Sequence, residues 1–322
     1  MKRILCIGEA LIDMICTNRG TSLSGGQHFE KKPGGAPCNV AATIAAMGGS
    51  VELAAKVGND PFGNQLIETM KGFGVSTKWM LKDDEHFTTM AFVSLMEKGE
   101  RDFVFNRGAD GYLSKDDLTA IDLDKFSIIH FGSATAFLPG PFQETYTHFL
   151  QEGLKKDIFI SFDPNYRHLL FKNNTKSFVE QSWNFLNKCD FFKLSDEEAL
   201  LITDCDELNE AVKILSQKTN AVFAITLGKK GALLRCNDTI EIIPAIPANV
   251  IDTTGAGDAF VGAVLDQLNK AADIKSISVA DPIAIGWTNI ILNANKIAAK
   301  TCEHLGAMES LKYVDKNNFT QI

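Results

Sequence analysis

The sequence predicts an α/β fold in three layers, with a mostly parallel β-sheet between two layers of helices and a small antiparallel β flap. Three observations support this prediction. Short apolar runs alternate with helical stretches along most of the chain, which is typical of a parallel sheet covered on both faces. Two segments, about 10–33 and 88–110, break this rhythm with strand-like alternation. No repeat, low-complexity tract or Pro-rich linker divides the chain, so we expect one domain over residues 1–322.

The strands and helices of the main sheet follow one another in regular order. The expected strands are Arg3–Gly8, Val51–Val57, Ser127–Phe131, Asp157–Phe162, Asp190–Leu194, Val222–Thr226 and Gly231–Arg235. The expected helices are Asn39–Met47, Pro61–Phe73, Pro141–Leu154, Ser177–Asn187, Ser195–Ile202 and Leu208–Ser216. Gly48 and Gly49 end the first helix, because glycine is favoured just past a helix C-terminus. Ligands of open α/β sheets bind beyond the carboxyl ends of the strands, so the polar residues that follow these strands are candidate site residues.

The two segments outside this rhythm predict the flap. Thr88–Phe105 is interpreted as a hairpin, with strands Met90–Met96 and Arg101–Phe105 joined by a turn at Glu97–Glu100. Ala10–Lys32 alternates in character and then enters a polar, Gly-rich turn. We expect both segments to extend the main sheet as a flap rather than to form a separate core.

Composition and charge exclude several classes of protein. The apolar fraction of 45% and the charged fraction of 22% are those of an ordinary globular protein. A net charge of −8 argues against a nucleic-acid-binding face, and no apolar run approaches the length of a membrane span. Lys2 and Arg3 lead directly into a strand, so no signal peptide is expected. Seven scattered cysteines without a Cys-x-x-Cys pair predict a reduced, cytoplasmic protein, and the histidines form no zinc motif.

The segment Asp252–Asp258 (DTTGAGD) is the most informative stretch of the chain. It precedes the apolar, helix-favouring run Ala259–Leu265, and its glycines leave the backbone at the helix start free of side chains. Free N–H groups and the helix dipole bind anions there. A carboxylate at Asp258 would repel a phosphate unless a hydroxyl lies between them, which predicts a base for phosphoryl transfer to an alcohol. The residues alone equally allow an ordinary capped helix start.

Motifs far apart in the chain resemble the ribokinase-like (PfkB) carbohydrate kinase family over essentially the whole sequence. Gly34–Ala41 (GGAPCNVA) and Lys56–Gly63 (KVGNDPFG) resemble the first signature of that family, and Asp252–Asp258 resembles its second. Two long motifs in the family's order are a far stronger signal than a single glycine-rich triplet. The resemblance implies a ribokinase-like fold.

The resemblance also implies roles for individual residues. Asp258 is implied as the catalytic base, and the amides of Gly255, Ala256 and Gly257 as the anion hole. Implied contacts to the sugar or the transferred phosphate come from Asp13, Gly34, Gly35, Asn39, Arg107 and Arg167. From the residues alone, Asp13 is suited to cap a turn in the flap, and only the resemblance favours a functional role for it. Arg167 is suited to form a surface ion pair, but its place after the carboxyl end of a strand favours a functional role. Cys38, His130 and His168 are interpreted as packing or surface residues.

The implied cofactors are ATP and Mg²⁺ and, as in many members, a monovalent cation such as K⁺. The implied nucleotide-binding residues are Thr226, Gly228, Asn295 and Ser195. Ser195 replaces the Asn of the family's Asn-x-x-Glu motif, whereas Glu198 keeps the carboxylate, and a hydroxyl can still hold a metal-bound water. Asp252 and Thr254, with carbonyls near 301–306 and Ser310, match the region of the monovalent cation. Asp252 is equally interpretable as a turn residue.

The motifs are most similar to those of fructokinases, which implies transfer of phosphate from ATP to fructose. Kinases of 2-keto-3-deoxygluconate and of aminoimidazole riboside share parts of them and remain alternatives. A sugar-sensing relative without catalysis would lack the base or a phosphate-holding glycine, and both are present here. A Rossmann dehydrogenase is disfavoured because Gly8-Glu9-Ala10 follows the first strand instead of Gly-x-Gly-x-x-Gly. Family members often form a homodimer through the flap edge, which the resemblance allows here.

Overall fold

The computed structural model describes residues 2–18, 20–95, 101–270 and 286–314. Its strands are β1 (Arg3–Ile7), β2 (Leu11–Cys16), β3 (Phe29–Gly34), β4 (Val51–Gly58), β5 (Ser76–Asp83), β6 (Met90–Leu95), β7 (Arg101–Asn106), β8 (Phe126–Phe131), β9 (Phe159–Phe162), β10 (Phe191–Ser195), β11 (Val222–Thr226), β12 (Ala232–Cys236) and β13 (Thr239–Ile243). Its α-helices are α1 (Ala36–Ala46), α2 (Pro61–Phe73), α3 (Pro141–Lys155), α4 (His168–Phe171), α5 (Thr175–Leu186), α6 (Asp196–Thr203), α7 (Leu208–Lys218), α8 (Ala256–Lys270) and α10 (Trp287–Thr301).

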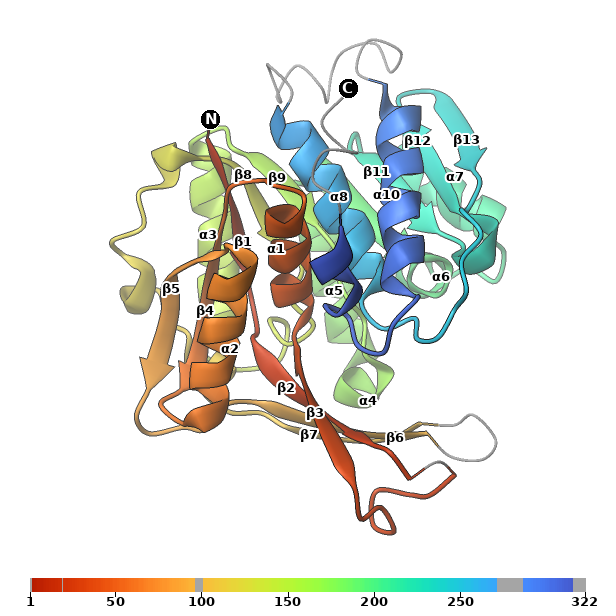
Figure 1. Cartoon of the computed structure of the whole chain (residues 1–322). Coiled ribbons are helices and arrows are strands. Elements are labelled where there is room, and N and C mark those ends of the chain that lie inside the picture. The colour runs from red at the N-terminus through yellow and green to blue at the C-terminus, as the bar shows by residue number, and fades with distance from the viewer. Residues whose placement is uncertain (1, 19, 96–100, 271–285, 315–322) are drawn as a thin grey trace.

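The strands form two sheets, which confirms the predicted fold class. Within the described residues the main sheet has nine strands in the order β13-β12-β11-β10-β9-β8-β1-β4-β5, and every neighbouring pair is parallel except β11–β12 and β12–β13, because β12 runs in the opposite direction. Helices cover both of its faces, and a four-stranded second sheet projects from one end (Figure 1). Among the described helices, none combines the length and the apolar character needed to span a bilayer.

Alternate residues of the central strand face opposite helical layers. Ile4 and Cys6 of β1 pack into the core beneath α1, α2, α8 and α10, whereas Leu5 and Ile7 pack into the core beneath α3, α5, α6 and α7. This two-residue period is what a strand buried on both faces requires. The resulting burial makes β1 a rigid support for the residues that follow its carboxyl end.

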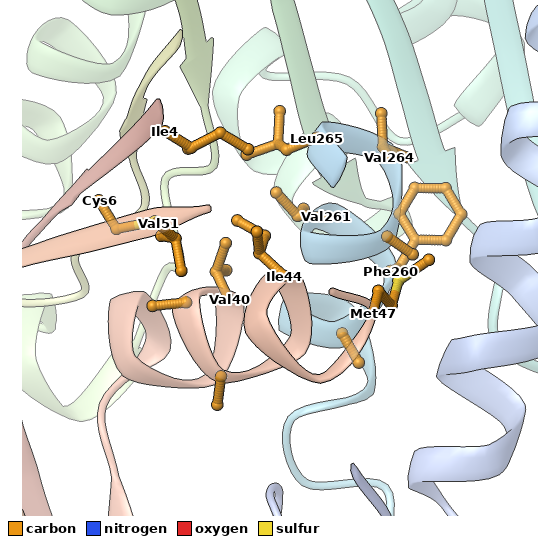
Figure 2. Packing of buried hydrophobic residues seen from close by; sticks show 14 of the residues in the cluster. Ile4, Cys6, Val40, Ile44, Met47, Val51, Phe260, Val261, Val264 and Leu265 are labelled. Atoms are coloured by element: carbon orange, nitrogen blue, oxygen red, sulfur yellow. The ribbon is translucent and has the colours of Figure 1, made fainter. Parts of the chain in front are cut away.

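Helices α1 and α8 pack closely against each other on the first of these faces. Figure 2 shows Val40 and Ile44 of α1 on the side of that helix that faces Val261 of α8. A Cβ added to Gly262 would lie 2.7 Å from the Thr43 Cβ, so glycine lets the two helices approach. The pairing of α1 with α8 brings residues from the two family-like motifs to one place.

The second sheet, ordered β3-β2-β6-β7, is the predicted flap. Its outer pairs, β2–β3 and β6–β7, are antiparallel as expected, but the two hairpins join through a parallel pair that matches Ile12 with Met90. Residues 96–100, which contain the predicted turn Glu97–Glu100 and Met96, lie outside the described residues. Because β2 follows β1 directly and β3 leads into α1, the flap is anchored beside the start of α1.

All seven predicted strands of the main sheet are present, and most boundaries differ by one or two residues. Strand β9 begins at Phe159 because Asp157 has a φ of +53°, a left-handed turn conformation that interrupts an extended strand. Helix α1 begins three residues earlier than predicted, at Ala36, with Pro37 in its first turn, where a missing N–H costs nothing. Helix α8 begins at Ala256, so Asp258 lies within its first turn.

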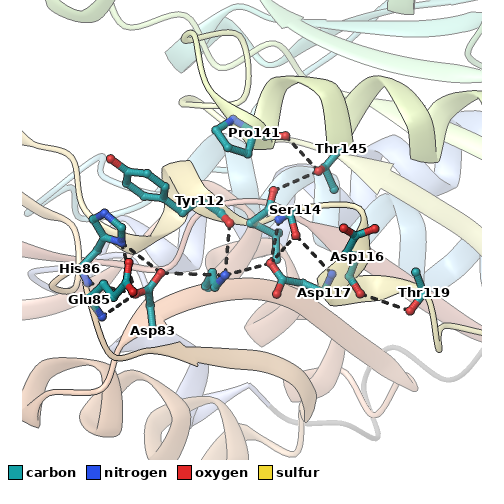
Figure 3. Close-up of polar contacts among 12 residues, drawn as sticks. Asp83, Glu85, His86, Tyr112, Ser114, Asp116, Asp117, Thr119, Pro141 and Thr145 are labelled. Carbon is teal, nitrogen blue, oxygen red and sulfur yellow. Dashed lines mark hydrogen bonds and ion pairs between the residues drawn. The ribbon is translucent and has the colours of Figure 1, made fainter.

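A polar cluster ties the β4–β5 edge of the main sheet to the short 3₁₀ turns Ala109–Tyr112 and Asp116–Leu118 (Figure 3). Lys56 of β4 donates to Asp117 Oδ2 at 2.9 Å and to the Tyr112 carbonyl at 3.2 Å. The Tyr112 ring stacks on His86 at 3.5 Å between centroids, and His86 is also bound to Asp83. This cluster fixes the segment that leads from β5 into the flap.

Candidate active site

The start of α8 forms a turn that leaves main-chain N–H groups available. Gly255 has a φ of +78°, and a Cβ added to it would lie 2.3 Å from the Ala307 Cβ. The N–H groups of Gly257 and Asp258 lie in the first helical turn, where no carbonyl four residues earlier belongs to the helix. Ala256 opens the helix and donates its N–H to the Thr253 carbonyl at 3.3 Å. The turn therefore offers the N–H groups of Gly257 and Asp258 at a helix start, the position at which helices bind anions, whereas the Ala256 N–H already donates to a carbonyl.

Asp258 is nearly buried at this turn, with 5% of its surface exposed. Asn39 of α1 donates its Nδ2 hydrogen bond to Asp258 Oδ2 at 2.7 Å. Burial raises the pKa of Asp258 above its usual value, while the Asn39 hydrogen bond and the charges of Arg167 and Lys193 lower it. Such a carboxylate keeps one oxygen for a proton and has a basicity above that of an exposed aspartate.

Asp13 and the glycine pair Gly34–Gly35 lie beside this carboxylate. A Cβ added to Gly34 would lie 2.1 Å from Asp13 Oδ2, so the glycine makes room for that side chain. Gly35 has a φ of +103° and caps α1, and a Cβ on it would lie 2.4 Å from the Glu9 carbonyl oxygen. Burial raises the pKa of Asp13 to about 7, opposed by the Arg167 charge and reinforced by Asp258. Asp13, Asp258 and Arg167 thus share one electrostatic environment.

The two predicted arginines have different surroundings. Arg167 is exposed at the start of α4 and donates to the Tyr166 carbonyl at 3.2 Å, and within the described ranges no carboxylate lies within 4.0 Å of it. Arg107 follows β7 and donates to the carbonyls of Pro139 at 2.8 Å and Thr135 at 3.2 Å, with its Nε 3.6 Å from Asp110 Oδ2. The Arg167 guanidinium is therefore the more available of the two for an anionic ligand, because the Arg107 guanidinium already contacts two carbonyls and a carboxylate of the protein.

Glu9 is a buried site residue that the sequence did not single out. It accepts hydrogen bonds from the Ala36 N–H at 3.2 Å and the Ala134 N–H at 3.3 Å, and also from the Ser133 hydroxyl. Burial raises the pKa of Glu9 to about 7. The carboxylate joins the carboxyl end of β1 to the start of α1, and so it positions Gly35 and Asn39. Its place directly after the first strand is the signal that marks it in the sequence.

Ser195 and Glu198 form a capping box at the start of α6. Ser195 Oγ accepts from the Glu198 N–H at 3.1 Å, and Glu198 Oε2 accepts from the Ser195 N–H at 2.8 Å. Glu198 Oε1 also accepts from the Tyr166 N–H at 2.8 Å, which ties α6 to the loop that carries Arg167. Each Glu198 oxygen keeps a lone pair after these bonds. The predicted metal-site pair is thus also a structural clasp between two loops.

Lys193 is a second residue that the sequence did not single out. It lies on β10 with 7% of its side chain exposed, and its Nζ donates to Asp163 Oδ2 at 3.1 Å. Burial lowers the pKa of Lys193, but Asp163, Glu198 and Asp258 raise it, and the net shift is upward. The lysine is therefore charged in the folded protein.

The predicted nucleotide-binding residues divide into two groups. Thr226 is paired with Ser195 across β10 and β11, and Gly228 follows it with a φ of +56° and open space around its Cα. Asn295 lies on α10, where its Nδ2 donates to the carbonyls of Ile243 at 3.1 Å and Pro244 at 3.0 Å. A Cβ added to Gly231, three residues after Gly228, would lie 2.0 Å from that Ile243 oxygen. Thr226, Gly228 and Ser195 thus gather at adjacent strand ends, whereas the Asn295 amide holds the end of β13.

The predicted cation region is assembled around Asp252. Its Oδ1 accepts from the Thr254 N–H at 3.0 Å and the Thr254 hydroxyl at 2.7 Å, and its Oδ2 accepts from the Gly306 N–H at 2.8 Å. Ser310 donates to the Thr301 carbonyl at 3.3 Å. Across the described ranges no group of three or more His, Cys, Asp or Glu residues is arranged to bind a metal ion directly. Any divalent metal here needs further oxygen ligands from a substrate or from water.

The chain is similar in sequence and in structure to known sugar kinases. The chain is 34% identical over 274 residues to probable fructokinase-5 of Arabidopsis thaliana, a match that covers 84% of each chain. It is 34% identical over 316 residues to a putative sugar kinase of Pyrococcus horikoshii, covering 96% of this chain and 95% of the relative. The fructokinase of Vibrio cholerae O395, solved in its fructose-, ADP- and calcium-bound form, has a TM-score of 0.82 and 29% identity, with 97% of this chain and 96% of that chain covered.

The family model described as pfkB family carbohydrate kinase matches residues 1–313. This match includes both motifs, the flap strands and the turn that carries Asp258. The chain therefore belongs to the pfkB family of carbohydrate kinases and is a sugar phosphotransferase.

Proposed function

We propose that this kinase transfers the γ-phosphoryl group of ATP to fructose and forms fructose 6-phosphate and ADP. The observation that carries the proposal is the nearly buried Asp258 carboxylate in the first turn of α8, held by Asn39 beside the Gly255 turn. The names of the relatives support fructose as the substrate, since several are fructokinases and one was solved with fructose and ADP.

The residues suggest how the sugar is held and activated. Asp13, the Gly34–Gly35 backbone and Asn39 present carboxylate, main-chain and amide groups, which suit vicinal hydroxyls. The 6-hydroxyl of fructose donates its proton to Asp258 as its oxygen attacks the γ-phosphorus of ATP. The bond between that phosphorus and the bridging oxygen then breaks, and ADP leaves with the electron pair. Arg167, which is exposed and whose charge acts on Asp13 and Asp258, suits an oxygen of the transferring group.

The turn before α8 receives the charge of the transferring group. The N–H groups of Gly255, Ala256, Gly257 and Asp258 form the proposed anion hole, which binds the equatorial oxygens in the transition state. The Ala256 N–H, which donates to the Thr253 carbonyl at 3.3 Å, must share or leave that long bond to take part. Thr226, Gly228 and Ser195 lie at adjacent strand ends and are the proposed nucleotide contacts, with Asn295 supporting that region from α10. Closure of the flap over the sugar excludes water, which would otherwise accept the phosphoryl group.

The residues fit Mg²⁺ held mainly by phosphate oxygens and water. Glu198 keeps one lone pair on each oxygen after binding N–H groups, and Ser195 keeps its hydroxyl donor, so both can hold metal-bound water. When bound, Mg²⁺ neutralises negative charge on the nucleotide phosphates. The Asp252–Thr254 turn and the carbonyls near 301–306 are the proposed place of a K⁺ ion beside the anion hole.

A panel of sugars assayed for ATP consumption tests this proposal and names the substrate. The panel contains fructose, 2-keto-3-deoxygluconate and aminoimidazole riboside, each with ATP and Mg²⁺. We expect the highest kcat/KM with fructose, because the Asp13 carboxylate disfavours the anionic 2-keto-3-deoxygluconate and the relatives named as fructokinases favour fructose over aminoimidazole riboside. A higher kcat/KM with either of the other two replaces fructose as the substrate. ATP consumption with none of them contradicts catalysis and favours a sugar-binding, non-catalytic protein.

A further inference from the structure

Lys193 lies directly behind the glycine turn of the proposed anion hole. A Cβ added to Gly257 would lie 3.1 Å from the Lys193 Nζ and 3.6 Å from its Cε. The ammonium therefore packs against the main chain of Gly257, and there is little room for any side chain at that position. Lys193 reaches this place from β10, whereas Asn39 binds Asp258 from α1.

The lysine charge is only partly matched by direct hydrogen bonds. The Lys193 Nζ has three N–H groups, and one of them donates a hydrogen bond to Asp163 Oδ2 at 3.1 Å. Glu198 Oε2 lies 4.0 Å from the same Nζ, which is too far for a hydrogen bond. Both Glu198 oxygens accept main-chain N–H groups instead. Without Lys193, two nearly buried carboxylates would face the start of α8 and repel a bound phosphate. The positive charge of Lys193 offsets this repulsion between the carboxylates and the phosphate, and it does so strongly because the site is buried and its dielectric constant is low.

We propose that Lys193 supplies a fixed positive charge behind the phosphoryl-binding turn and stabilises the transferring group more strongly in the transition state than in bound ATP. This inference rests on the proposed kinase function of the same site. A preorganised charge aimed at the place where negative charge develops acts without reorganisation and raises kcat. Lys193 acts through the field it exerts on the turn and on Asp258, and is a positioning residue in that sense.

A purely structural role is the alternative that the experiment must separate. The Asp163–Lys193 pair joins the end of β9 to β10, and removing the lysine alone would leave a nearly buried carboxylate without its partner. The double variant Lys193→Met with Asp163→Asn removes both charges and keeps the side-chain volumes similar. Neutral replacement of a whole buried ion pair is often tolerated by a fold. This variant therefore tests the charge without the unpaired acid.

The measurement compares two nucleotide complexes by calorimetry in the presence of Mg²⁺ and fructose. ADP with aluminium fluoride mimics the transferring phosphoryl group, and AMP-PNP mimics bound ATP. We expect the double variant to bind the aluminium fluoride complex on the order of 10–100-fold more weakly, with a similar fall in kcat. We expect its affinity for AMP-PNP to change by less than about threefold, because ground-state binding uses the lysine less.

Two single variants serve as controls. Asp163→Asn keeps the lysine and removes one acid, so it should bind the aluminium fluoride complex at least as tightly as the wild type. Lys56→Met removes a half-buried lysine that pairs with Asp117 in the cluster of Figure 3, away from the glycine turn, and should leave both affinities unchanged. Unchanged binding of the aluminium fluoride complex by the folded double variant contradicts the proposal, as does an equal loss for both nucleotides. A wild-type protein that consumes no ATP with any sugar of the panel contradicts the kinase function itself.

Discussion

Replacement of Asp258 by Asn lowers kcat with fructose and ATP by about 10²–10⁴-fold, because the sugar hydroxyl loses its general base. The substitution is nearly isosteric, and its side-chain oxygen can still accept the hydrogen bond from Asn39 that Asp258 Oδ2 accepts at 2.7 Å. The fold should therefore survive. Steady-state assays with purified protein give kcat, and thermal unfolding reports on stability. Turnover within about tenfold of the wild type means that Asp258 is not the base.

A second aspartate on the same helix provides the matched control. Asp266 lies about two turns after Asp258, is also buried, and has a pKa raised to about 6 by burial. It forms an ion pair with Lys270 at 2.6 Å and lies outside the proposed site. Asp266→Asn removes a buried carboxylate from α8 without touching the reaction. We expect its kcat to equal that of the wild type, with a loss of stability only.

Replacement of Gly255 by Ala lowers kcat by about 10²–10³-fold, the loss expected when one donor of an anion hole is displaced. Gly255 has a φ of +78°, which a side chain disfavours, and the new Cβ would lie 2.3 Å from the Ala307 Cβ. The turn must move to relieve this contact, and its N–H groups then no longer point at the oxygens of the transferring group. Steady-state kinetics of the folded variant test this result.

Gly74→Ala separates the backbone effect from the contact with Ala307. Gly74 has a φ of +94° at the end of α2, and a Cβ added to it meets no atom within 4 Å. The control variant should lose about 1 kcal/mol of stability from the left-handed conformation. Its kcat should not change. If Gly255→Ala behaves like this control, the turn before α8 does not hold the transferring group.

The sequence predicts the main sheet well because most of its strands are buried on both faces. Runs such as Val222–Thr226 are apolar except for the final threonine, and their boundaries follow from the polar residues around them. The two strands without a prediction, β5 and β13, lie at the two edges of the sheet. Edge strands carry polar and apolar residues in a mixed order, as in Thr239–Ile243, and give no continuous apolar run.

The sequence predicts those parts of the candidate site whose functional residues follow one another within one short segment. The Gly255–Asp258 turn is readable because glycines, a carboxylate and a helix start follow one another directly. Lys193 has a weaker signal: a lysine within the apolar strand Phe191–Ser195 requires a buried partner. That partner, Asp163, follows β9, and only the pairing of β9 with β10 brings the two together. The hydrogen bonds that hold Arg107 come likewise from loops distant in sequence.

A crystal structure of the wild-type protein with fructose and AMP-PNP tests the proposed arrangement most directly. We expect an Asp258 carboxylate oxygen about 2.6–3.2 Å from the 6-hydroxyl of fructose, with the γ-phosphate at the Gly255–Gly257 turn on the other side of that hydroxyl. A sugar bound with its 6-hydroxyl against Asp13 instead, or a γ-phosphate held away from the turn, would contradict it.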